Sequence, residues 1–454
     1  MKVVALRLSR RSGLAPYAIV LILVIVIAAA GASAYFLLAP NQGGNKSSST
    51  TTTVASGYTT TSATSESTLE TSTSTLPTTA VSTSSQAAAS YGSVASTLIL
   101  YNNTLESGLP DISTSTFQGN YSTVSIFDMI YDPGNGYLYG SGFYSNASSS
   151  TPIPENVLMV INPNTNKVID MIQLSSQAPD QMAYDSANGY IYGTDSHSIN
   201  ITVFDANTNT VLPILSVAGS DCATIQFTCN EFTGIAYDAN SNLVYANFCC
   251  GDRTLAYPPS VLTTINPVTG SISTSLTLYA YNVWGHVFYD TSNQLLYVTS
   301  STNPGTYGGA FGNLTVINPS TSQILKTIQV GYPSGPETFA FDPATSDIFV
   351  ACEGNVSVIS STTDAVVGTI NLPQSMSFTY PPMIGSIAFD PQNGFLYATG
   401  GTSPTFGALA IDPTTDSIAG VITTNVPTYA IAFAPSSGEV YMGDFSFGVI
   451  DIVS

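Results

Sequence analysis

Six polar residues with ligand-binding side chains occupy equivalent places in a repeated sequence. They are Asp128, Asp180, Gln181, His286, Glu337 and Thr338. Carboxylate oxygens are common ligands of divalent cations, and imidazole nitrogens bind transition metals. Amide and hydroxyl groups add hydrogen bonds to a polar small molecule. These residue types predict a site for a polar ligand, or for a divalent cation held by the three carboxylates and the histidine, if the fold brings the repeats together.

The repeat is marked by an aromatic residue followed by Asp. The six pairs are Tyr131-Asp132, Tyr184-Asp185, Tyr237-Asp238, Tyr289-Asp290, Phe341-Asp342 and Phe389-Asp390, and a seventh unit has Phe433-Ala434. Their spacings are 53, 53, 52, 52, 48 and 44 residues. In "AYDSANGYIYGTD" (183–195), Asp and Asn-Gly signal a tight turn between two strands. A third strand and turn recur, as in "LTVINPSTSQIL" (314–325), and a fourth strand follows, so each period predicts one four-stranded propeller blade.

The two ends of the repeat region indicate how a ring would close. The seventh unit contains three strands, after which the chain ends, and the stretch "STLILYNNT" (96–104) precedes the first hairpin without a partner. Pairing this stretch with the last unit would complete the sheet and remove exposed edges. The sequence therefore predicts an all-β, seven-bladed propeller over residues 96–454, closed by its N-terminal strand. Five or six regular blades with degenerate ends are the alternative.

Aligning the repeats on the Asp predicts where the six polar residues lie. The position one before the Asp is always aromatic and the position three before it is always apolar, which is the alternation of a buried strand. The polar residues occur four and five positions before the Asp. Since the innermost strands begin on the loop-rich face, these residues should surround the mouth of the central channel. A hydrated polar rim without a ligand is the alternative interpretation.

Two stretches resemble a known family of repeats. "LLYVTSST" (295–302) is similar to the Tyr-Val-Thr-Asn signature of YVTN-type β-propeller repeats, and "VINPSTSQILKTIQVG" (316–331) resembles the strand-turn-strand that follows it. The resemblance covers about residues 120–454. It implies a cell-surface or secreted protein, often archaeal. It does not imply a reaction, because related propellers include surface-layer proteins, lactonases and metal enzymes.

The N-terminal part of the chain has the pattern of a membrane anchor and a stalk. Residues 1–13 are basic, 14–39 form an apolar stretch long enough to cross a bilayer, and 40–95 are rich in Ser and Thr. Arginines before the apolar stretch predict a single-pass membrane protein with its propeller outside the cell. "RRSGLAPYAIVLILVIVI" (10–27) also resembles a type IV pilin-like, class III signal, which implies cleavage after Gly13. A cleaved secretory signal is the alternative. The Ser/Thr-rich segment is too poor in apolar residues to fold and predicts a disordered, glycosylated linker.

Cysteines and glycosylation motifs agree with an extracellular location. Four cysteines in two predicted loops on one face of the propeller are expected to form cross-paired disulfides, with a zinc site as the alternative: Cys222, Cys229, Cys249 and Cys250. Cys352 is expected to be a buried thiol. The glycosylation candidates in the propeller region are Asn102, Asn120, Asn146, Asn200, Asn313 and Asn355.

Composition excludes some functions and leaves two classes. The chain has 8 Lys and Arg against 28 Asp and Glu, a net charge of −20, which disfavours nucleic-acid binding. Common hydrolase, phosphate-binding and metalloprotease motifs are absent from the sequence. The sequence therefore favours a non-enzymatic surface protein that binds glycan or protein ligands or associates with a surface layer. No resident cofactor is expected beyond a divalent cation. The alternative is an exported lactonase-like hydrolase or lyase with its site at the channel mouth.

Overall fold

The computed structural model describes most of the region downstream of the predicted stalk. The described residues are 90–100, 121–146, 154–196, 198–216, 229–250, 260–278, 285–301, 312–331, 336–352, 354–372, 385–400, 407–424, 426–445 and 448–454. The predicted basic segment (1–13), transmembrane helix (14–39) and most of the linker (40–95) lie outside them. Within the described ranges, no helix has the length and hydropathy needed to cross a membrane.

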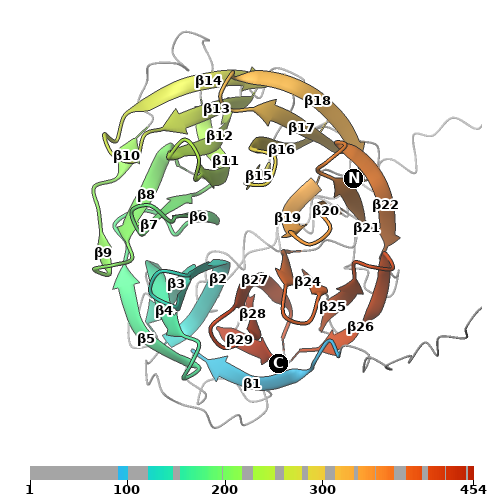
Figure 1. The fold of residues 1–454 in the computed structure, drawn as a ribbon. Coiled ribbons are helices and arrows are strands. Elements are labelled where there is room, and N and C mark those ends of the chain that lie inside the picture. The colour runs from blue at the N-terminus through green and yellow to red at the C-terminus, as the bar shows by residue number, and fades with distance from the viewer. Residues whose placement is uncertain are drawn as a thin grey trace, which may run out of the picture. The chain divides into compact units, whose positions relative to one another are not determined.

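The described residues form seven antiparallel sheets arranged around a central opening (Figure 1), so the predicted seven-bladed propeller is confirmed. Blades 1 to 3 consist of β2 (Tyr121–Asp132), β3 (Tyr137–Asn146), β4 (Pro154–Asn162) and β5 (Lys167–Gln173); β6 (Gln181–Asp185), β7 (Tyr190–Thr194), β8 (Asn200–Asp205), β9 (Thr210–Val211) and β10 (Leu215–Ser216); and β11 (Cys229–Asp238), β12 (Leu243–Cys250), β13 (Ser260–Ile265) and β14 (Ile272–Leu278).

The remaining four blades follow in chain order. Blades 4 and 5 consist of β15 (Val287–Asp290), β16 (Leu295–Ser301), β17 (Gly312–Asn318) and β18 (Gln323–Val330), and of β19 (Pro336–Asp342), β20 (Asp347–Cys352), β21 (Asn355–Ser360) and β22 (Ala365–Asn371). Blade 6 has β23 (Ile387–Asp390), β24 (Phe395–Gly400), β25 (Gly407–Asp412) and β26 (Ser417–Thr423), and blade 7 has β27 (Thr428–Ala434), β28 (Glu439–Asp444), β29 (Val449–Val453) and β1 (Val94–Ile99).

The repeated Asp ends the innermost strand and caps the turn that follows it. In blade 2, Asp185 Oδ1 accepts hydrogen bonds from the backbone N–H groups of Ala187 (2.9 Å) and Asn188 (3.2 Å). The turn closes at Gly189, whose φ of 72° is in the left-handed region that glycine adopts without strain. The other described Asp turns have the same form, which confirms the predicted hairpin. This turn explains why the number of residues between the first two strands is the same in the repeats.

The buried tyrosine of the second strand links each of several blades to the next. Tyr297, the tyrosine of "LLYVTSST", is fully buried and donates a hydrogen bond of 2.8 Å to Asp364 Oδ1 in blade 5. Tyr139 donates in the same way to Asn209 of blade 2 (3.0 Å), and Tyr441 of blade 7 donates to Asn166 of blade 1. Each blade junction of this type therefore joins a core side chain to a turn of the neighbouring blade.

The aromatic–Asp pair provides a second set of links near the channel. The Tyr184 hydroxyl lies near the Asp132 carboxylate of the preceding blade and the Tyr237 hydroxyl lies near Asp185, and the Tyr237 hydroxyl donates a hydrogen bond of 2.9 Å to Asn242 Oδ1. The series stops at blade 5, where Phe341 has no hydroxyl group. Asp290 in blade 4 is completely buried, and its Oδ2 atom has no hydrogen-bond partner.

Bulges in the outer strands protect the edges of the blades. Ile169, Leu325 and Val367 are the extra residues of bulges in β5, β18 and β22, at the same place in each strand. Their side chains are 46%, 51% and 57% exposed. A bulge twists an edge strand away from regular pairing, so these mostly uncharged edges resist pairing with other chains.

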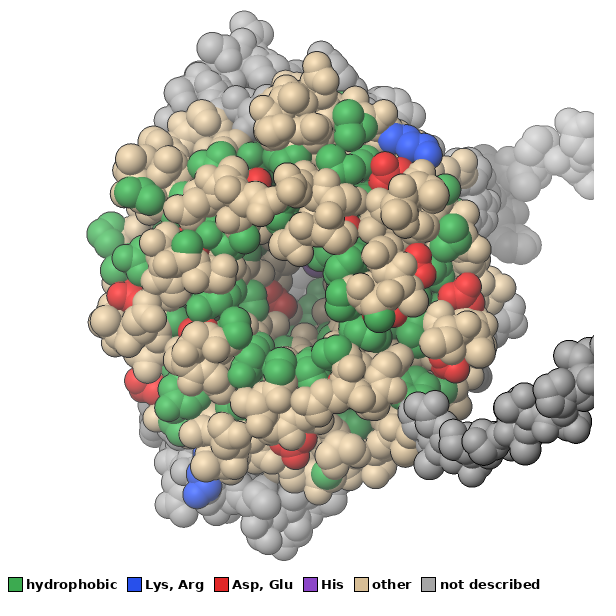
Figure 2. Space-filling model, viewed as in Figure 1, with side chains coloured by type: hydrophobic (Ala, Val, Ile, Leu, Met, Phe, Trp, Pro, Cys, Tyr) green, Lys and Arg blue, Asp and Glu red, His purple; other side chains and the backbone are tan. Residues whose placement is uncertain are grey.

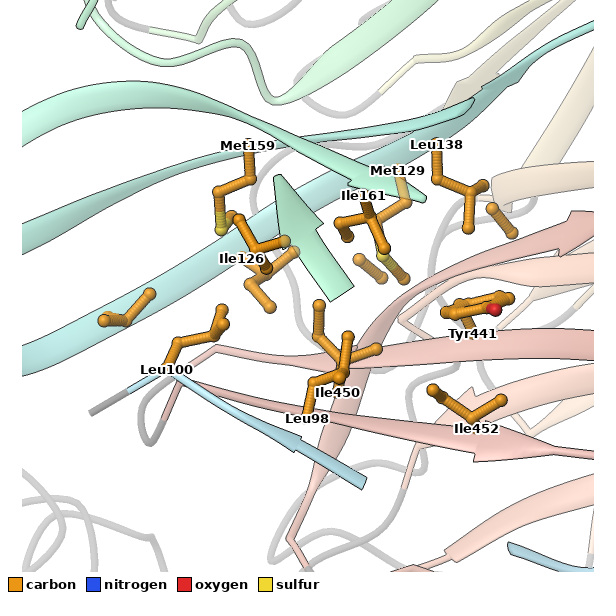
Figure 3. Close-up of a cluster of buried hydrophobic side chains, with 14 of the residues drawn as sticks. Leu98, Leu100, Ile126, Met129, Leu138, Met159, Ile161, Tyr441, Ile450 and Ile452 are labelled. Atoms are coloured by element: carbon orange, nitrogen blue, oxygen red, sulfur yellow. The ribbon is translucent and has the colours of Figure 1, made fainter. Parts of the chain in front are cut away.

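Strand β1 lies in the sheet formed by the C-terminal strands. It pairs antiparallel with β29, and Thr97 Oγ1 donates a buried hydrogen bond of 2.7 Å to Asp451. Leu98 and Ile450 pack with Ile126 and Met159 of blade 1 in one buried cluster (Figure 3). Burying each such side chain stabilises a fold by roughly 1.5–3 kcal/mol. The junction of blades 7 and 1 therefore has a core of its own.

Candidate binding site at the channel mouth

The innermost strands of the seven blades surround an opening in the centre of the ring (Figure 2). Hydrophobic side chains line much of its rim, and acidic and histidine side chains are visible on its wall. The six polar residues predicted from the sequence belong to these innermost strands or immediately precede them. Their hydrogen bonds show what each polar group does.

Several innermost strands contain a bulge at the position five before the repeat Asp. The strand register skips Phe127 in β2, Thr233 in β11, Glu337 in β19 and Tyr429 in β27. A bulge interrupts the alternation of faces and changes the direction of a side chain, and bulges are frequent beside binding sites. These bulges explain why the alternation of buried and exposed residues ends at the position five before the repeat Asp.

Asp128 joins blade 1 to blade 2. Its Oδ1 atom accepts a hydrogen bond from the backbone N–H of Met129 (2.9 Å), and its Oδ2 atom accepts one from Met182 in blade 2 (2.8 Å). Burial raises the pKa of Asp128 to about 7, because desolvation exceeds the effect of these two N–H groups, and the Asp180 carboxylate raises it further. Asp128 is therefore a structurally engaged carboxyl group that keeps its proton to a higher pH than an ordinary Asp.

The polar groups of blade 2 are also engaged with the backbone. Asp180 Oδ2 accepts a hydrogen bond of 2.7 Å from Ser196 N, and Gln181 Nε2 donates one of 2.7 Å to the Thr233 carbonyl in blade 3. Asp128 and Gln181 thus form successive links between blades 1, 2 and 3. This use of polar side chains was not predicted from the sequence.

His286 lies in blade 4 and stays neutral over most of the pH range. Burial lowers its pKa to about 3, and its ring meets the Phe339 ring edge-on at a centroid distance of 6.5 Å. A Cβ atom on Gly234 would lie 2.6 Å from the Gly285 carbonyl oxygen, so glycine permits the close approach of blades 3 and 4 beside it. Thr338 is buried, and the Glu337 side chain lies outside the described residues.

The predicted divalent-cation site is not assembled by the described side chains. Within the described ranges, no group of three or more His, Cys, Asp or Glu residues is placed to hold a metal ion. The Glu337 side chain is not among those described, so the cation site stays a prediction. The polar-ligand site also stays a prediction.

A row of aromatic side chains, which the sequence patterns did not reveal, lies at the junction of blades 7 and 1. Phe143, Phe127, Phe445 and Tyr429 form this aromatic row, and neighbouring ring centroids are 5.5 Å apart in each of its three contacts. Phe445 is 50% exposed and Tyr429 is 43% exposed, whereas the other two rings are half-buried. Since Phe127 and Tyr429 are both bulge residues, the bulges bring together rings from two blades.

The exposed end of the aromatic row is held by specific contacts. Thr399 Oγ1 donates a hydrogen bond of 2.7 Å to the Tyr429 carbonyl oxygen, and a Cβ atom on Gly385 would lie 2.9 Å from Tyr429 Cδ2. On the other side, the buried carboxylate of Asp444 accepts a hydrogen bond of 2.7 Å from Val449 N. This bond joins the end of β28 to the start of β29, next to Phe445 in the sequence.

The backbone constrains part of the predicted disulfide pattern. Cys229 in β11 is directly opposite Cys250 in β12, whereas Cys249 is opposite Glu231. Residue Cys222 and the side chains of Cys229, Cys249 and Cys250 lie outside the described residues, so the cross-pairing stays a prediction. Cys352 is a buried thiol at the end of β20, as expected.

The predicted glycosylation sites are only partly covered. Asn200, Asn313 and Asn355 are half-buried, and the Asn355 Oδ1 atom is buried without a hydrogen-bond partner. Asn102 and Asn120, and the Asn146 side chain, lie outside the described residues. Glycan attachment at these positions stays a prediction.

Comparison with known proteins does not assign a function to this channel mouth. A scan of known protein families finds none that matches the chain, and no curated protein matches it. The resemblance to YVTN-type repeats therefore stays a prediction, and the propeller fold is established by the sheet topology.

Proposed function

We propose that the chain is a membrane-anchored, extracellular β-propeller that acts as a non-enzymatic binding or adhesion protein of the cell surface. In this proposal the helix of residues 14–39 anchors the chain, residues 40–95 form a glycosylated stalk, and β1 closes the ring. The basic, apolar and Ser/Thr-rich segments of the sequence support the anchor and stalk. The YVTN-like repeats support a surface location.

The aromatic row is the observation that carries a binding function. Neighbouring half-exposed aromatic rings form an apolar surface patch, and such patches often mark interaction sites. Tyr429 and Phe445 are exposed, whereas Asp128 and Gln181 of the innermost strands are engaged in links between blades. These two rings are thus better suited than the two polar side chains to contact another molecule.

An exported hydrolase or lyase is the second candidate, because two groups on the innermost strands have displaced pKa values. The pKa of Asp128 is raised to about 7 and that of His286 is lowered to about 3, each mainly by burial. Groups whose pKa values are moved apart by burial are typical of acid–base catalysis. Both Asp128 oxygens already accept backbone hydrogen bonds, which favours a structural role and places this candidate second.

Binding to cell envelopes tests the proposal. The full chain in detergent micelles is immobilised through a C-terminal tag, and isolated envelope fragments of the source cells are passed over it. We expect saturable binding that the double variant Tyr429→Ala/Phe445→Ala weakens by roughly tenfold or more. The matched control Leu325→Ala/Val367→Ala, which truncates equally exposed side chains on the outer strands, should bind like the parent.

Two results would decide against this function. Absence of envelope binding by the parent chain would refute an adhesive role. Turnover of a lactone or ester panel by the parent, abolished by His286→Gln, would support the hydrolase instead.

A further inference from the structure

We propose that residues 90–93 form a strap that holds the ring closed, and that a pull on the predicted stalk releases this strap and β1 before the rest of the propeller unfolds. The inference rests on the proposed anchor and stalk, because these would supply the tension. It starts from four residues that belong to the predicted linker and yet contact blades 6 and 7.

The strap takes the place of an outer turn in blade 7. In blades 1 and 5, the turn between the third and fourth strands contains a residue with positive φ, 50° at Asn166 and 49° at Asp364. Gly92 has a φ of 76° and, like those residues, lies three positions before the bulge of the strand that follows it. Ser93 and Ser454 exchange two backbone hydrogen bonds of 3.3 Å, so the strap meets the end of β29 where a turn would join the two strands.

Tyr91 holds the strap against blade 6 by three contacts. Its carbonyl oxygen accepts a hydrogen bond of 2.8 Å from the hydroxyl group of Tyr397, the buried tyrosine of the second strand. Its ring meets the Phe395 ring edge-on, with the two centroids 6.1 Å apart. The Tyr91 ring also lies over Gly420 of β26, where any Cβ atom would clash with it. The strap thus provides the acceptor that an outer turn provides at other blade junctions.

The register of β1 makes the strap the first contact to meet a pull from the stalk. Val94, at the start of β1, pairs with Val453 near the end of β29, and the pairing continues along the strand to Ile99. A pull on the residues before Val94 therefore strains the pairs one after another instead of all together. Each backbone hydrogen bond contributes only about 1 kcal/mol net, so a strand pulled in this way separates easily unless earlier contacts resist. The contacts of Tyr91 are in that position.

Release of the strap and β1 would leave most of the ring unchanged. Strand β1 is the outermost strand of its sheet, beyond β29 (Figure 1). Residues 91–100 take part in the buried clusters at the two junctions of blade 7, and in none of the clusters described at the other five junctions. Local opening of such an edge element costs less free energy than global unfolding. Tension on the stalk would therefore loosen blade 7 first.

Magnetic tweezers on the full chain in detergent micelles test this, with handles on a peptide tag inserted after Ser84 and on a C-terminal tag. We expect a first, reversible step that lengthens the chain by roughly 30 Å or more, before the larger unfolding steps. At a fixed force, Tyr91→Ala should speed this step by roughly tenfold. Tyr397→Phe, which keeps its ring and removes one hydrogen bond, should speed it by roughly fivefold. The matched control Val421→Ala, an exposed residue of the same strand as Gly420, should open like the parent.

The outcomes separate this inference from the proposed function. A parent chain that unfolds without an earlier release would overturn the inference, and so would a first step whose rate is unchanged in both strap variants. Equal acceleration in the Val421→Ala control would show that the step does not depend on the strap, which overturns the inference as well. Envelope binding is measured without applied force, so adhesion stands or fails independently of these results.

Discussion

Replacing Phe341 by Tyr should stabilise the propeller, because it supplies a hydroxyl group at the one junction where a buried carboxylate oxygen has no partner in the described region. Asp290 is fully buried, Ser292 bonds its Oδ1 atom, and its Oδ2 atom has no hydrogen bond. At the equivalent junctions of blades 1 and 2, and of blades 2 and 3, a tyrosine hydroxyl lies near the corresponding carboxylate. One blade junction thus has an unpartnered carboxylate oxygen beside a phenylalanine, and two others have a tyrosine at the equivalent position.

The expected gain follows from the energetics of a buried hydrogen bond. A hydrogen bond contributes about 1 kcal/mol net, and more when one partner is charged and otherwise unpaired. A gain of 1 kcal/mol corresponds to a rise in melting temperature of roughly 1–2 °C for a ring of this size. The reverse change, Tyr184→Phe, removes the hydroxyl group near the Asp132 carboxylate and should lower stability by about 1 kcal/mol.

Differential scanning calorimetry on the full chain measures both changes. The matched control is Phe389→Tyr, at the next junction, where the Asp342 oxygens already accept hydrogen bonds from Ala344 N (2.8 Å) and Thr345 Oγ1 (3.0 Å). That control should change the melting temperature little. The reasoning is refuted if Phe341→Tyr does not stabilise the chain while Tyr184→Phe has no cost, because a tyrosine hydroxyl near the repeat Asp would then not stabilise a blade junction.

Three further predictions concern closure, packing and acid. Deleting residues 96–104 should lower the melting temperature far more than deleting nine residues of the Ser/Thr-rich stalk, because β1 pairs with β29; equal melting temperatures would contradict the closure. Gly234→Ala should cost about 1–3 kcal/mol in urea unfolding, because its Cβ atom would clash with the Gly285 carbonyl, whereas Gly140→Ala, with its nearest contact at 3.4 Å, should be nearly neutral. His286→Gln should stabilise the fold at pH 3 relative to pH 7 by on the order of 2–4 kcal/mol in the same assay; an equal effect at both pH values would show that the imidazole does not titrate on unfolding.

The sequence predicts the architecture because each repeat is specified by residues that are close together in the chain. The repeat Asp (Ala434 in the seventh unit) and the positive-φ residue define each hairpin turn. The apolar residue three positions before the Asp is buried in most blades, as at Met129 and Ile235. Turn chemistry and period-two alternation act within a few residues and need no knowledge of the neighbouring blade. Seven copies of one local pattern therefore suffice to predict the seven sheets.

The site is less predictable because it depends on contacts between blades. The pattern places Asp128 at the channel mouth but does not show that its carboxylate accepts the Met182 N–H of the next blade. The aromatic row is even less predictable from the sequence. Two of its rings lie in bulges that interrupt the alternation, and Phe445 follows the end of another strand. A search for aromatic residues at the five-before position would have found Phe127 and Tyr429 but not their contact through Phe445.

The two displaced pKa values on the innermost strands have opposite effects on stability in acid. The pKa of Asp128 is raised from its ordinary value of 3.8 to about 7, so its contribution to stability is complete below about pH 4 and is lost as the pH rises towards 7. The pKa of His286 is lowered from 6.5 to about 3, so its contribution is complete above pH 6.5 and is lost as the pH falls towards 3.

Because the two pKa shifts are similar in size, acidification from pH 7 to 3 should add about as much to the free energy of unfolding at Asp128 as it removes at His286. Few basic groups remain to repel one another once the carboxylates are protonated. We therefore expect the full chain to keep its β-sheet circular dichroism spectrum at pH 3, and the Asp128→Asn variant to lose stability at pH 3 relative to the parent. Unfolding of the parent at pH 3 with recovery at pH 7 would show that the stability lost at His286 exceeds the stability gained at Asp128, and that this fold is not adapted to acid.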